Sequence, residues 1–493
     1  MRVLLLAMPN STWALDLYAK LPNLAITSLA SNVNEQHEVE VADLVLVRRT
    51  FKSFLETRIT KHTPDVVGLS AMSYQAKAAR YISRFIKRLD PEIKVILGGY
   101  HATTMAEEVG QAWGTDLDFI IRGEGESTFR QLLQSLDTGG PDFHEIKGLS
   151  FKKYDTFIHN PRQELEDLCL IKKPKRSSRI LKDGFHTFGL NADVIESSRG
   201  CLNNCKFCSI QKMYGRSFRK FPLDRTLSEI DSCSKNGVRS ITFVDDNINM
   251  DADHFSSLCD GIIEWGLNDI HYSIQASVKG LYDKPTLLKK LVDANFKFVF
   301  LGIESHNTRN LKLYGKKIKE MARKAKSLVS YLRNHNILVA GGFITGNPDD
   351  TSKDFYNVLD YAKEIKVDLA IFSALQPYPE TEIREILLDR NLVFNVDDFS
   401  RYDGVTHNAR TTYLTRKQVE ILRERLWTGF YDIDWLIWNN FRRIYPAYFM
   451  KLFLQIAPRI MKSAFYEITR LRSPYEIVQQ ILQYEKDFRD LKR

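Results

Sequence analysis

Three cysteines within eight consecutive positions are the clearest chemical feature of this sequence. Cys201, Cys205 and Cys208 are separated by three and two residues. One loop with this spacing can place three thiolates around one corner of a cubane iron–sulfur cluster, and the fourth iron then has no protein ligand. An open iron is a position at which a cofactor or a substrate can bind. The triplet therefore predicts a reactive [4Fe–4S] cluster.

A zinc site, a structural cluster and a disulfide framework are the alternative interpretations of these cysteines. A closed zinc site normally has four ligands, often from two cysteine pairs, and the sequence contains no second pair. Six cysteines in 493 residues, with Cys169, Cys233 and Cys259 scattered singly, are too few and too uneven for a disulfide framework. We therefore expect a reducing, cytoplasmic environment.

A folded scaffold must position the triplet, and the sequence indicates an α/β protein with two alternating regions. With 44% hydrophobic and 27% charged residues, the chain can bury two or three cores and lacks the composition of a disordered protein. In the first 150 residues, short apolar runs alternate with helical patterns, which predicts a doubly wound parallel sheet, similar to a Rossmann fold and buried on both faces. The predicted strands contain residues 3–6, 39–41, 66–69, 95–97 and 119–121.

A second alternation begins at Asp193. Six apolar runs at intervals of roughly 25 to 45 residues, with helical sequence between them, predict an incomplete parallel (β/α)6 barrel of the TIM type. The cysteine triplet follows the first of these runs, so we expect the chemistry at the carboxyl ends of the strands. The predicted barrel strands contain residues 194–195, 241–244, 271–274, 298–301, 337–340 and 369–372.

These patterns divide the chain into four predicted parts. Residues 1–150 form the first α/β domain, residues 151–190 a linker, residues 191–385 the barrel and residues 386–493 a helical C-terminal cap. The N-terminal apolar run is shorter than a signal-peptide core, and no stretch reaches the about 20 apolar residues that span a bilayer. We therefore expect a protein that is not integral to a membrane.

With its triplet at the end of a barrel strand and a sheet domain before it, the chain resembles the radical S-adenosylmethionine (SAM) superfamily, in the class with a cobalamin (B12)-binding domain. The resemblance covers residues 1 to about 385 and is carried by C-x3-C-x-aromatic-C, with Phe207 as the aromatic residue. It implies that the open iron chelates SAM, and that an external donor such as flavodoxin or ferredoxin supplies an electron. Cleavage of SAM then yields a 5′-deoxyadenosyl radical that abstracts hydrogen.

The resemblance also assigns SAM contacts to the ends of the later barrel strands. Phe207 would support the adenine, polar residues after the second strand would accept hydrogen bonds from the SAM amino group, and residues after the third and fourth would contact its ribose and methionine parts. A glycine-rich run on the fifth strand would lie beside the adenine. The alternatives are an ordinary helix N-cap for residues 245–247 and packing alone for the glycines. The assigned residues are Phe207, Asp245, Asp246, Asn247, Gln275, Ser277, Glu304, Gly342, Ile344 and Gly346.

The first domain lacks the Asp-x-His-x-x-Gly motif with which many cobalamin domains ligate cobalt, since residues 13–29 contain no histidine. The resemblance points instead to Gly-Gly-x-His-x-Thr at residues 98–103 and Arg-Gly-Glu-Gly-Glu at residues 122–126, which recur in the class that includes the anaerobic bacteriochlorophyll cyclase and the hopanoid methylases. A bound cobalamin is thus expected without a histidine on cobalt, and a domain that has lost its ligand is the alternative. The candidate cobalamin contacts are Asn10, Ser70, Tyr100, His101, Thr103, Gly123, Glu124 and Gly125.

The C-terminal part of the chain is basic and aromatic. Residues 401–493 contain 17 Lys plus Arg against 10 Asp plus Glu, which accounts for most of the net charge of +9. Residues 429–453 mix Trp, Tyr and Phe with basic residues, which is typical of a helix in a membrane interface and of a helix that caps an incomplete barrel. We favour a cap that lines an apolar substrate pocket, with peripheral membrane contact as the alternative, and expect no nucleic-acid partner.

These features predict an enzyme that functionalises an unactivated carbon of a small apolar, lipid-like or polycyclic molecule. Cobalamin-dependent methyl transfer is the leading hypothesis, and radical cyclisation or rearrangement is the near alternative. Methylthiolation is disfavoured because the first domain has no cysteine to hold a second cluster. A non-catalytic iron–sulfur or B12-binding sensor is the alternative from a different class.

Overall fold

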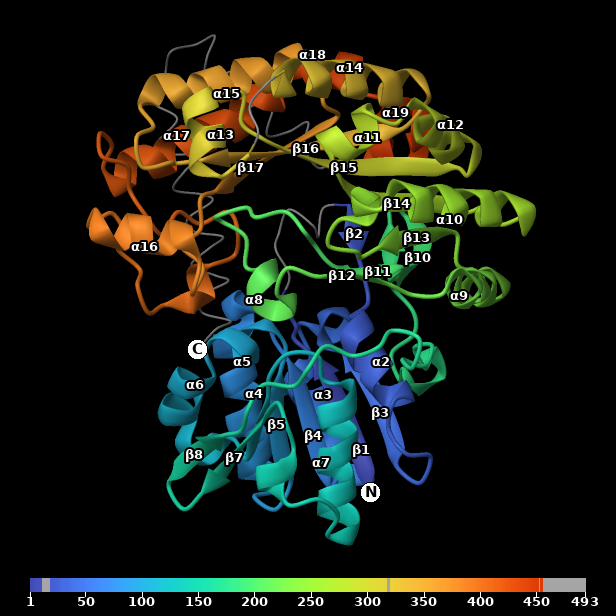
Figure 1. Cartoon of the computed structure of the whole chain (residues 1–493), viewed down its shortest axis with the longest axis vertical. Coiled ribbons are helices and arrows are strands. Elements are labelled where there is room, and N and C mark those ends of the chain that lie inside the picture. The colour runs from blue at the N-terminus through green and yellow to red at the C-terminus, as the bar shows by residue number, and fades with distance from the viewer. Residues whose placement is uncertain (11–17, 317–319, 452, 455–493) are drawn as a thin grey trace.

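A computed structural model describes residues 1–10, 18–316, 320–451 and 453–454, which form two α/β units, one above the other in Figure 1. The first unit contains a seven-stranded sheet in the order β3-β1-β4-β5-β6-β7-β8. Its first five strands in chain order are parallel, and the last two are antiparallel. The strands are β1 (Arg2–Ala7), β3 (Glu38–Asp43), β4 (Val66–Ser70), β5 (Lys94–Gly98), β6 (Phe119–Ile121), β7 (Leu149–Lys153) and β8 (Thr156–His159).

Both faces of this sheet are buried, because successive side chains of a strand point to opposite faces. In β1, Leu4 and Leu6 belong to one apolar cluster, while Val3 and Leu5 belong to another. The chain order of the parallel strands reverses between β1 and β4. Ligands of doubly wound sheets bind in the crevice beyond the carboxyl ends of strands at such a reversal. Helices α2 (Leu24–Ser31), α3 (Phe51–His62), α4 (Ala76–Leu89), α6 (Ala106–Trp113) and α7 (Glu126–Thr138) surround the sheet.

The second unit contains the predicted incomplete barrel. Its eight-stranded sheet has the order β17-β16-β15-β14-β13-β10-β9-β2, and its six longer strands are parallel. All eleven strands predicted from the sequence are confirmed. The strands are β10 (Leu190–Ile195), β13 (Ser240–Phe243), β14 (His271–Ser277), β15 (Phe296–Glu304), β16 (Leu338–Thr345), β17 (Leu369–Ala374), β9 (His186–Thr187) and β2 (Ala19–Lys20).

Two segments join the units more closely than a simple linker would. Strand β2 follows β1 in the chain but pairs with β9, so the N-terminal part of the chain contributes to the barrel sheet. The predicted linker also differs from the structure, because residues 151–159 continue the first sheet through β7 and β8. Arg179 then forms a bridge with Val41 at the edge of the same sheet. The part of the predicted linker that lies outside both sheets is therefore residues 160–185, apart from the bridge of Arg179.

The aromatic C-terminal segment packs against one end of the barrel. Trp435 donates from Nε1 to the carbonyl of Asp368, which directly precedes β17, and Tyr445 contacts His271 at the start of β14. The segment therefore closes the amino ends of the strands, away from the carboxyl ends at which we expect the chemistry. The helices of this region are α16 (Glu382–Asp389), α17 (Arg416–Phe430), α18 (Ile433–Trp438) and α19 (Phe441–Ile444).

Within the described residues, no helix is both long enough and apolar enough to cross a membrane.

Candidate functional site

The cysteine loop begins at a short ribbon between the two units. Strand β11 (Ser198–Gly200) pairs with β12 (Phe218–Lys220), and helix α8 (Ile210–Tyr214) follows the loop. Gly200, with φ +89°, lies so close to Ser217 that a Cβ would collide with the Ser217 carbonyl oxygen. Only glycine permits this approach without strain. The ribbon therefore fixes the point at which the chain enters Cys201.

The three thiols are close enough to affect one another electrostatically. Burial raises the pKa of Cys205, and burial followed by repulsion from the other two cysteines raises the pKa of Cys208 to about 12. Three neighbouring thiolates therefore require a positive partner, and iron ions supply that charge. Among the described residues, no three His, Cys, Asp or Glu side chains meet closely enough to hold a single metal ion. The donor set itself, three thiols on one loop, fits a cluster.

The two acidic residues that follow β13, Asp245 and Asp246, have different surroundings. Asp245 accepts hydrogen bonds from the Ser197 backbone and hydroxyl at 3.0 and 2.6 Å and from the Ser198 hydroxyl at 2.5 Å. Its carboxylate is 3% exposed and already engaged, so it shapes the turn before the cysteine loop rather than facing the predicted SAM site. Asp246 accepts from the Gly200 backbone at 2.9 Å, and burial raises its pKa to about 6. Asp246 therefore lies directly beside the entry to the loop.

Asn247 is the residue of this run that is best placed for a ligand. Its Nδ2 lies 3.8 Å from Cys201 Sγ, and its Oδ1 is buried without a hydrogen-bond partner in the described structure. An unpaired buried amide oxygen costs free energy unless a donor reaches it. The ammonium group of SAM is such a donor, so the orphaned oxygen fits the predicted amino contact.

The later strands bring a second set of polar groups to the same edge. Gln275 is exposed, although it lies within β14, whereas Ser277 is engaged by Asn249. Glu304 ends β15 with φ +65° and accepts from Lys316 Nζ at 2.8 Å. Although burial lowers the pKa of Lys316, Glu304 and then Cys205 raise it above its ordinary value. Sequence reasoning missed Lys316 and Asn249, because neither belongs to a recognisable motif.

Phe207 and the glycine-rich run lie in one apolar cluster beside the loop. The Phe207 ring packs edge-on against the Tyr314 ring, with ring centroids 5.2 Å apart, and Ile344 belongs to the same cluster. A Cβ on Gly342 would collide with the Phe300 ring, and one on Gly346, at φ +75°, would collide with His407. The two glycines are thus required by packing in this structure, while Phe207 and Ile344 lie together as the predicted adenine site requires.

In the first unit, the predicted cobalamin loops gather at the carboxyl ends of the strands. Thr103 accepts from the Gly123 backbone and donates to the Gly99 carbonyl, both at 2.9 Å, so it links the loops after β5 and β6. Gly123, with φ +79°, has no atom near the position of a Cβ. The side-chain oxygen Oδ1 of Asn10 is buried without a partner in the described part of the chain. An orphaned amide and an open glycine fit a polar ligand such as the corrin periphery.

The remaining predicted cobalamin residues have different environments. Ser70 ends β4 and is partly buried, while Gly125 packs against Leu29, where a Cβ would lie 3.3 Å from a methyl carbon. His101 is 4% exposed, and its ring centroid lies 6.0 Å from that of Phe399. Burial lowers the pKa of His101 to about 4. Tyr100 has its pKa raised by burial and then by negative charge on neighbours that include Asp246 and Cys208. Tyr100 therefore faces the cysteine loop.

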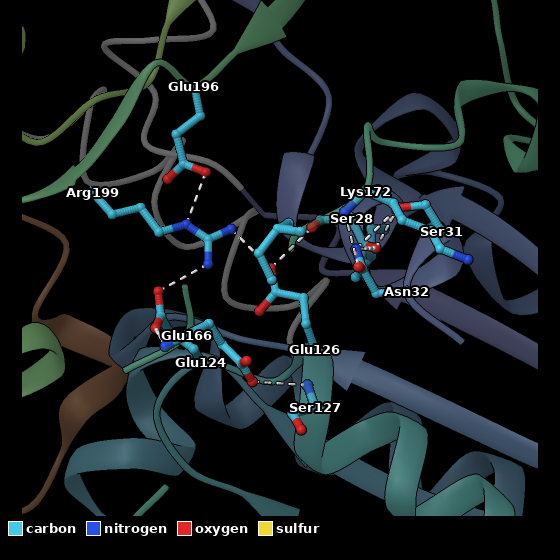
Figure 2. Close-up of polar contacts among 12 residues, drawn as sticks. Ser28, Ser31, Asn32, Glu124, Glu126, Ser127, Glu166, Lys172, Glu196 and Arg199 are labelled. Atoms are coloured by element: carbon cyan, nitrogen blue, oxygen red, sulfur yellow. Dashed lines mark hydrogen bonds and ion pairs between the residues drawn. The ribbon is translucent and has the colours of Figure 1, made fainter. Parts of the chain in front are cut away.

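A buried ion cluster joins the Arg-Gly-Glu-Gly-Glu loop to the cysteine ribbon. Figure 2 shows Arg199 directed at three carboxylates. Its nitrogens donate to Glu124 at 2.9 Å, to Glu126 at 2.8 Å and to Glu196 at 3.0 Å. Arg199, Glu124 and Glu126 are all less than 9% exposed. The carboxylate of Glu124, which we predicted to contact cobalamin, pairs with Arg199 of the β11–β12 ribbon.

A second arginine completes this cluster. Arg219 of β12 donates twice to Glu124, at 2.8 and 2.9 Å, and once to the Glu166 carbonyl at 2.6 Å. Bidentate arginine–carboxylate pairs fix orientation as well as distance. Although burial raises the pKa of Glu126, Arg199 outweighs it and holds that pKa below its usual range. We call Arg199, Arg219, Glu124, Glu126 and Glu196 the interdomain clamp.

Two family models match the chain. A model described as B12 binding domain matches residues 12–133, and one described as Radical SAM superfamily matches residues 195–362. These ranges contain the loops of the first unit and the cysteine loop. The cofactors are therefore a [4Fe–4S] cluster, SAM and cobalamin.

Curated relatives match most of the chain. An uncharacterised methyltransferase of Pyrococcus horikoshii is 27% identical over 412 residues, 83% of this chain and 88% of that protein. The bacteriochlorophyllide d C-8(2)-methyltransferase of Chlorobaculum tepidum is 25% identical, with 78% and 79% covered. The anaerobic magnesium-protoporphyrin IX monomethyl ester cyclase of Cereibacter sphaeroides is 25% identical, with 79% and 61% covered.

A solved structure shares the fold over most of the chain. The cobalamin-dependent SAM radical enzyme OxsB, with aqua-cobalamin and SAM bound, has a TM-score of 0.69 and 18% sequence identity. The match covers 98% of this chain and 75% of that one. Both α/β units and the helical C-terminal region therefore form an arrangement known from a solved protein.

Proposed function

Because this chain belongs to the radical SAM enzymes that carry a B12-binding domain, we propose that it transfers a methyl group to an unactivated carbon of a predominantly apolar small molecule. The interdomain clamp is the observation that supports this proposal most strongly. It joins the loop after β6, at the cobalamin side, to the ribbon that leads into Cys201. Methyl transfer requires the two cofactor sites to face one substrate, and ion pairs that join these two loops support such an arrangement.

When bound, the cluster delivers one electron to SAM and cobalamin carries the methyl group. The residues of this chain bind and orient these groups. Cys201, Cys205 and Cys208 would hold the cluster, Asn247 would accept from the SAM amino group, and Phe207 would lie beside the adenine. Lys316 places a positive charge beside Cys205, where a carboxylate of SAM could pair with it.

Apolar side chains near the carboxyl ends of the barrel strands support an apolar substrate. Val244, which directly follows β13, is 42% exposed, and the Phe300 ring lies over Gly342 on the neighbouring strand. Gln275 supplies an amide at the same edge. A site lined by apolar groups with few polar ones suits a lipid-like or polycyclic molecule.

An isotope experiment tests this proposal against its alternatives. Cells grown with methionine that carries a trideuterated methyl group, with and without the gene, would be compared by mass spectrometry of lipids and metabolites. We expect a product that is heavier by the labelled methyl group in the strain with the gene. A gene-dependent product without the label would favour radical cyclisation, for which the cyclase of Cereibacter sphaeroides is a precedent. Failure of the purified protein to form 5′-deoxyadenosine from SAM and a reductant would contradict both.

We further propose peripheral contact with a membrane, through the outer side of the C-terminal segment. Ile437, Met450 and Leu454 are 59%, 56% and 66% exposed, and Arg442 and Arg443, between Ile437 and Met450 in the sequence, are exposed as well. Exposed apolar residues flanked by arginine are typical of a helix that lies on anionic lipid. Sedimentation with vesicles that contain anionic lipid would test this contact, and equal sedimentation with neutral vesicles would contradict the electrostatic part.

A further inference from the structure

The segment between α16 and α17 returns to the first unit. Its η7 turn (Phe399–Arg401) packs against η2 (Ser73–Gln75) and α4, and both of these elements follow β4. Phe399 packs on the apolar cluster of the first sheet that contains Ala102. We call residues 395–402 the strap. The strap lies outside both ranges that the family models match, so neither family description covers this contact.

Buried polar contacts hold the strap on the side of the second unit. Tyr402 is 1% exposed and donates from its hydroxyl to the Asn395 carbonyl at 2.6 Å, which closes the strap into a turn. Arg384 of α16 donates to the Tyr402 hydroxyl at 3.2 Å and to the Val396 carbonyl at 3.1 Å. The guanidinium carbon of Arg384 also lies 5.8 Å from the centre of the Phe399 ring. The helical region that follows the barrel therefore sets the position of Phe399.

On the first unit, the Phe399 ring meets His101 in the loop after β5. The two ring centroids are 6.0 Å apart with 54° between the ring planes, and His101 is 4% exposed. The His101 backbone donates to the Ala71 carbonyl at 3.2 Å, which ties this loop to the one after β4. A Cβ on Gly99, at φ +94°, would collide with the same Ala71 backbone. Phe399 therefore covers the residue at which two of the predicted cobalamin loops meet.

An ion pair at the rim of this contact adds little to it. Lys77 of α4 lies 2.8 Å from Asp398, but the two side chains are 65% and 35% exposed. Solvent screens exposed ion pairs, so their contribution to stability is small. The contact between the two rings is thus the part of the strap that can fix the conformation of the loop.

We propose that Phe399 is a positioning residue for cobalamin: the second unit holds its ring against His101, and this contact fixes the loop after β5 in the conformation that binds the cofactor. Phe399 acts through His101, and neither side chain ligates cobalt. A loop that is already ordered binds more tightly, because it loses less conformational freedom on binding. The proposal rests on cobalamin binding by the first unit and not on the group that is transferred, so the labelled-methyl experiment can fail without affecting it.

A double-mutant cycle on cobalamin affinity tests this role. Hydroxocobalamin would be titrated into the reconstituted full-length protein by equilibrium dialysis, with the wild type, Phe399→Ala, His101→Ala and the double variant. We expect each single variant to bind about tenfold more weakly, and the double variant to bind no more weakly than His101→Ala, because residues in contact have non-additive effects. Phe399→Leu keeps an apolar contact and should lose less affinity than Phe399→Ala.

A matched variant separates this contact from general damage to the strap region. Phe394→Ala removes a ring whose centre lies 4.5 Å from the guanidinium carbon of Arg416, and it should leave cobalamin affinity and iron content unchanged. Wild-type affinity in Phe399→Ala would overturn the proposal. Additive losses in the double variant would also overturn it, because the two rings would then act independently. If Phe399→Ala does not fold, Phe399→Val takes its place in the cycle under the same criterion of non-additivity.

Discussion

The two edges of the barrel sheet have opposite chemistry. At the carboxyl edge, Asp246, Asn247 and Glu304 place charged and amide groups beside the cysteine loop, and Gln275 is exposed within a strand. At the amino edge, aromatic rings fill the space. The same six strands thus have one edge with polar groups beside the cysteine loop and another edge covered by aromatic rings.

The amino edge is built from distant parts of the chain. Phe188 stacks on Tyr445 with ring centroids 4.6 Å apart, and it also contacts Tyr18, Phe298 and Phe441. Buried aromatic pairs stabilise a fold through area and geometry. Buried polar groups without partners, such as Asn247 Oδ1, reduce stability instead. The comparison teaches that the amino edge stabilises the fold, while the carboxyl edge retains unpaired polar groups that ligands can satisfy.

The largest expected effect is at the carboxyl edge. Cys205→Ala removes one of three thiolate ligands, so iron content and formation of 5′-deoxyadenosine should fall to background in a protein that remains folded. Iron analysis and anaerobic SAM cleavage measure this. The matched control changes Cys169 to Ser and Cys233 and Cys259 to Ala, and should retain roughly four irons per chain, as one [4Fe–4S] cluster requires. Lost iron in the folded control, or full SAM cleavage by Cys205→Ala, would show that the cluster is held elsewhere.

The next effect concerns the clamp that holds the carboxyl edge against the first unit. Arg199→Ala leaves Glu126 buried without its cation, which should lower the free energy of unfolding by about 3 to 5 kcal/mol. Urea unfolding checks this value. Arg239→Ala removes an exposed pair with Asp269 at 3.8 Å and should change stability by less than about 0.5 kcal/mol. Equal stability of the two variants would mean that the clamp adds no coupling between the units.

A smaller effect is expected at the amino edge. Trp435→Phe keeps the buried ring but removes the hydrogen bond to the Asp368 carbonyl, 2.8 Å long in the structure. Stability should fall by about 1 to 2 kcal/mol, while SAM cleavage per folded molecule stays unchanged. Trp265→Phe, at a position 46% exposed, is the control and should have almost no effect. Loss of SAM cleavage in Trp435→Phe would show that the two edges are not functionally separate.

Sequence reasoning predicted the strands of both sheets because each is a continuous apolar run, and burial on two faces leaves that signature whatever the tertiary arrangement. The cysteine triplet was equally visible, because its ligands are local. The clamp was not predictable, since Arg199 and Glu124 are 75 residues apart and no periodicity records their pairing. The hydrogen bonds of Asp245 were not predictable for the same reason, because its partners Ser197 and Ser198 come from another strand end.

The position of the aromatic segment also could not be predicted from the sequence. A helix with aromatic and basic residues can cover either end of a barrel, because its amphipathic pattern specifies an apolar contact but not which one. The choice depends on particular hydrogen bonds, such as that of Asn440 with Asp368 and that of Tyr445 with His271. Both contacts join residues more than 70 positions apart, so tertiary structure alone decides them.

The smallest expected effect concerns His101, on the side of the first unit that faces the carboxyl edge. Its pKa of about 4 keeps the imidazole neutral at neutral pH, and its Nδ1 has no partner among the described residues, so its chemistry alone would allow it to ligate cobalt. Its environment argues against this role, because the ring is 4% exposed and packs against Phe399.

We therefore expect the cob(II)alamin form of the loaded protein to show no superhyperfine splitting from an axial nitrogen in its electron paramagnetic resonance spectrum. His101→Ala should leave the spectrum unchanged, with Phe399→Leu as the control for local packing. A nitrogen splitting that is present in the wild type and lost only in His101→Ala would mean that the first unit supplies a metal ligand, and that cobalt lies deeper in its sheet than the open Gly123 loop indicates.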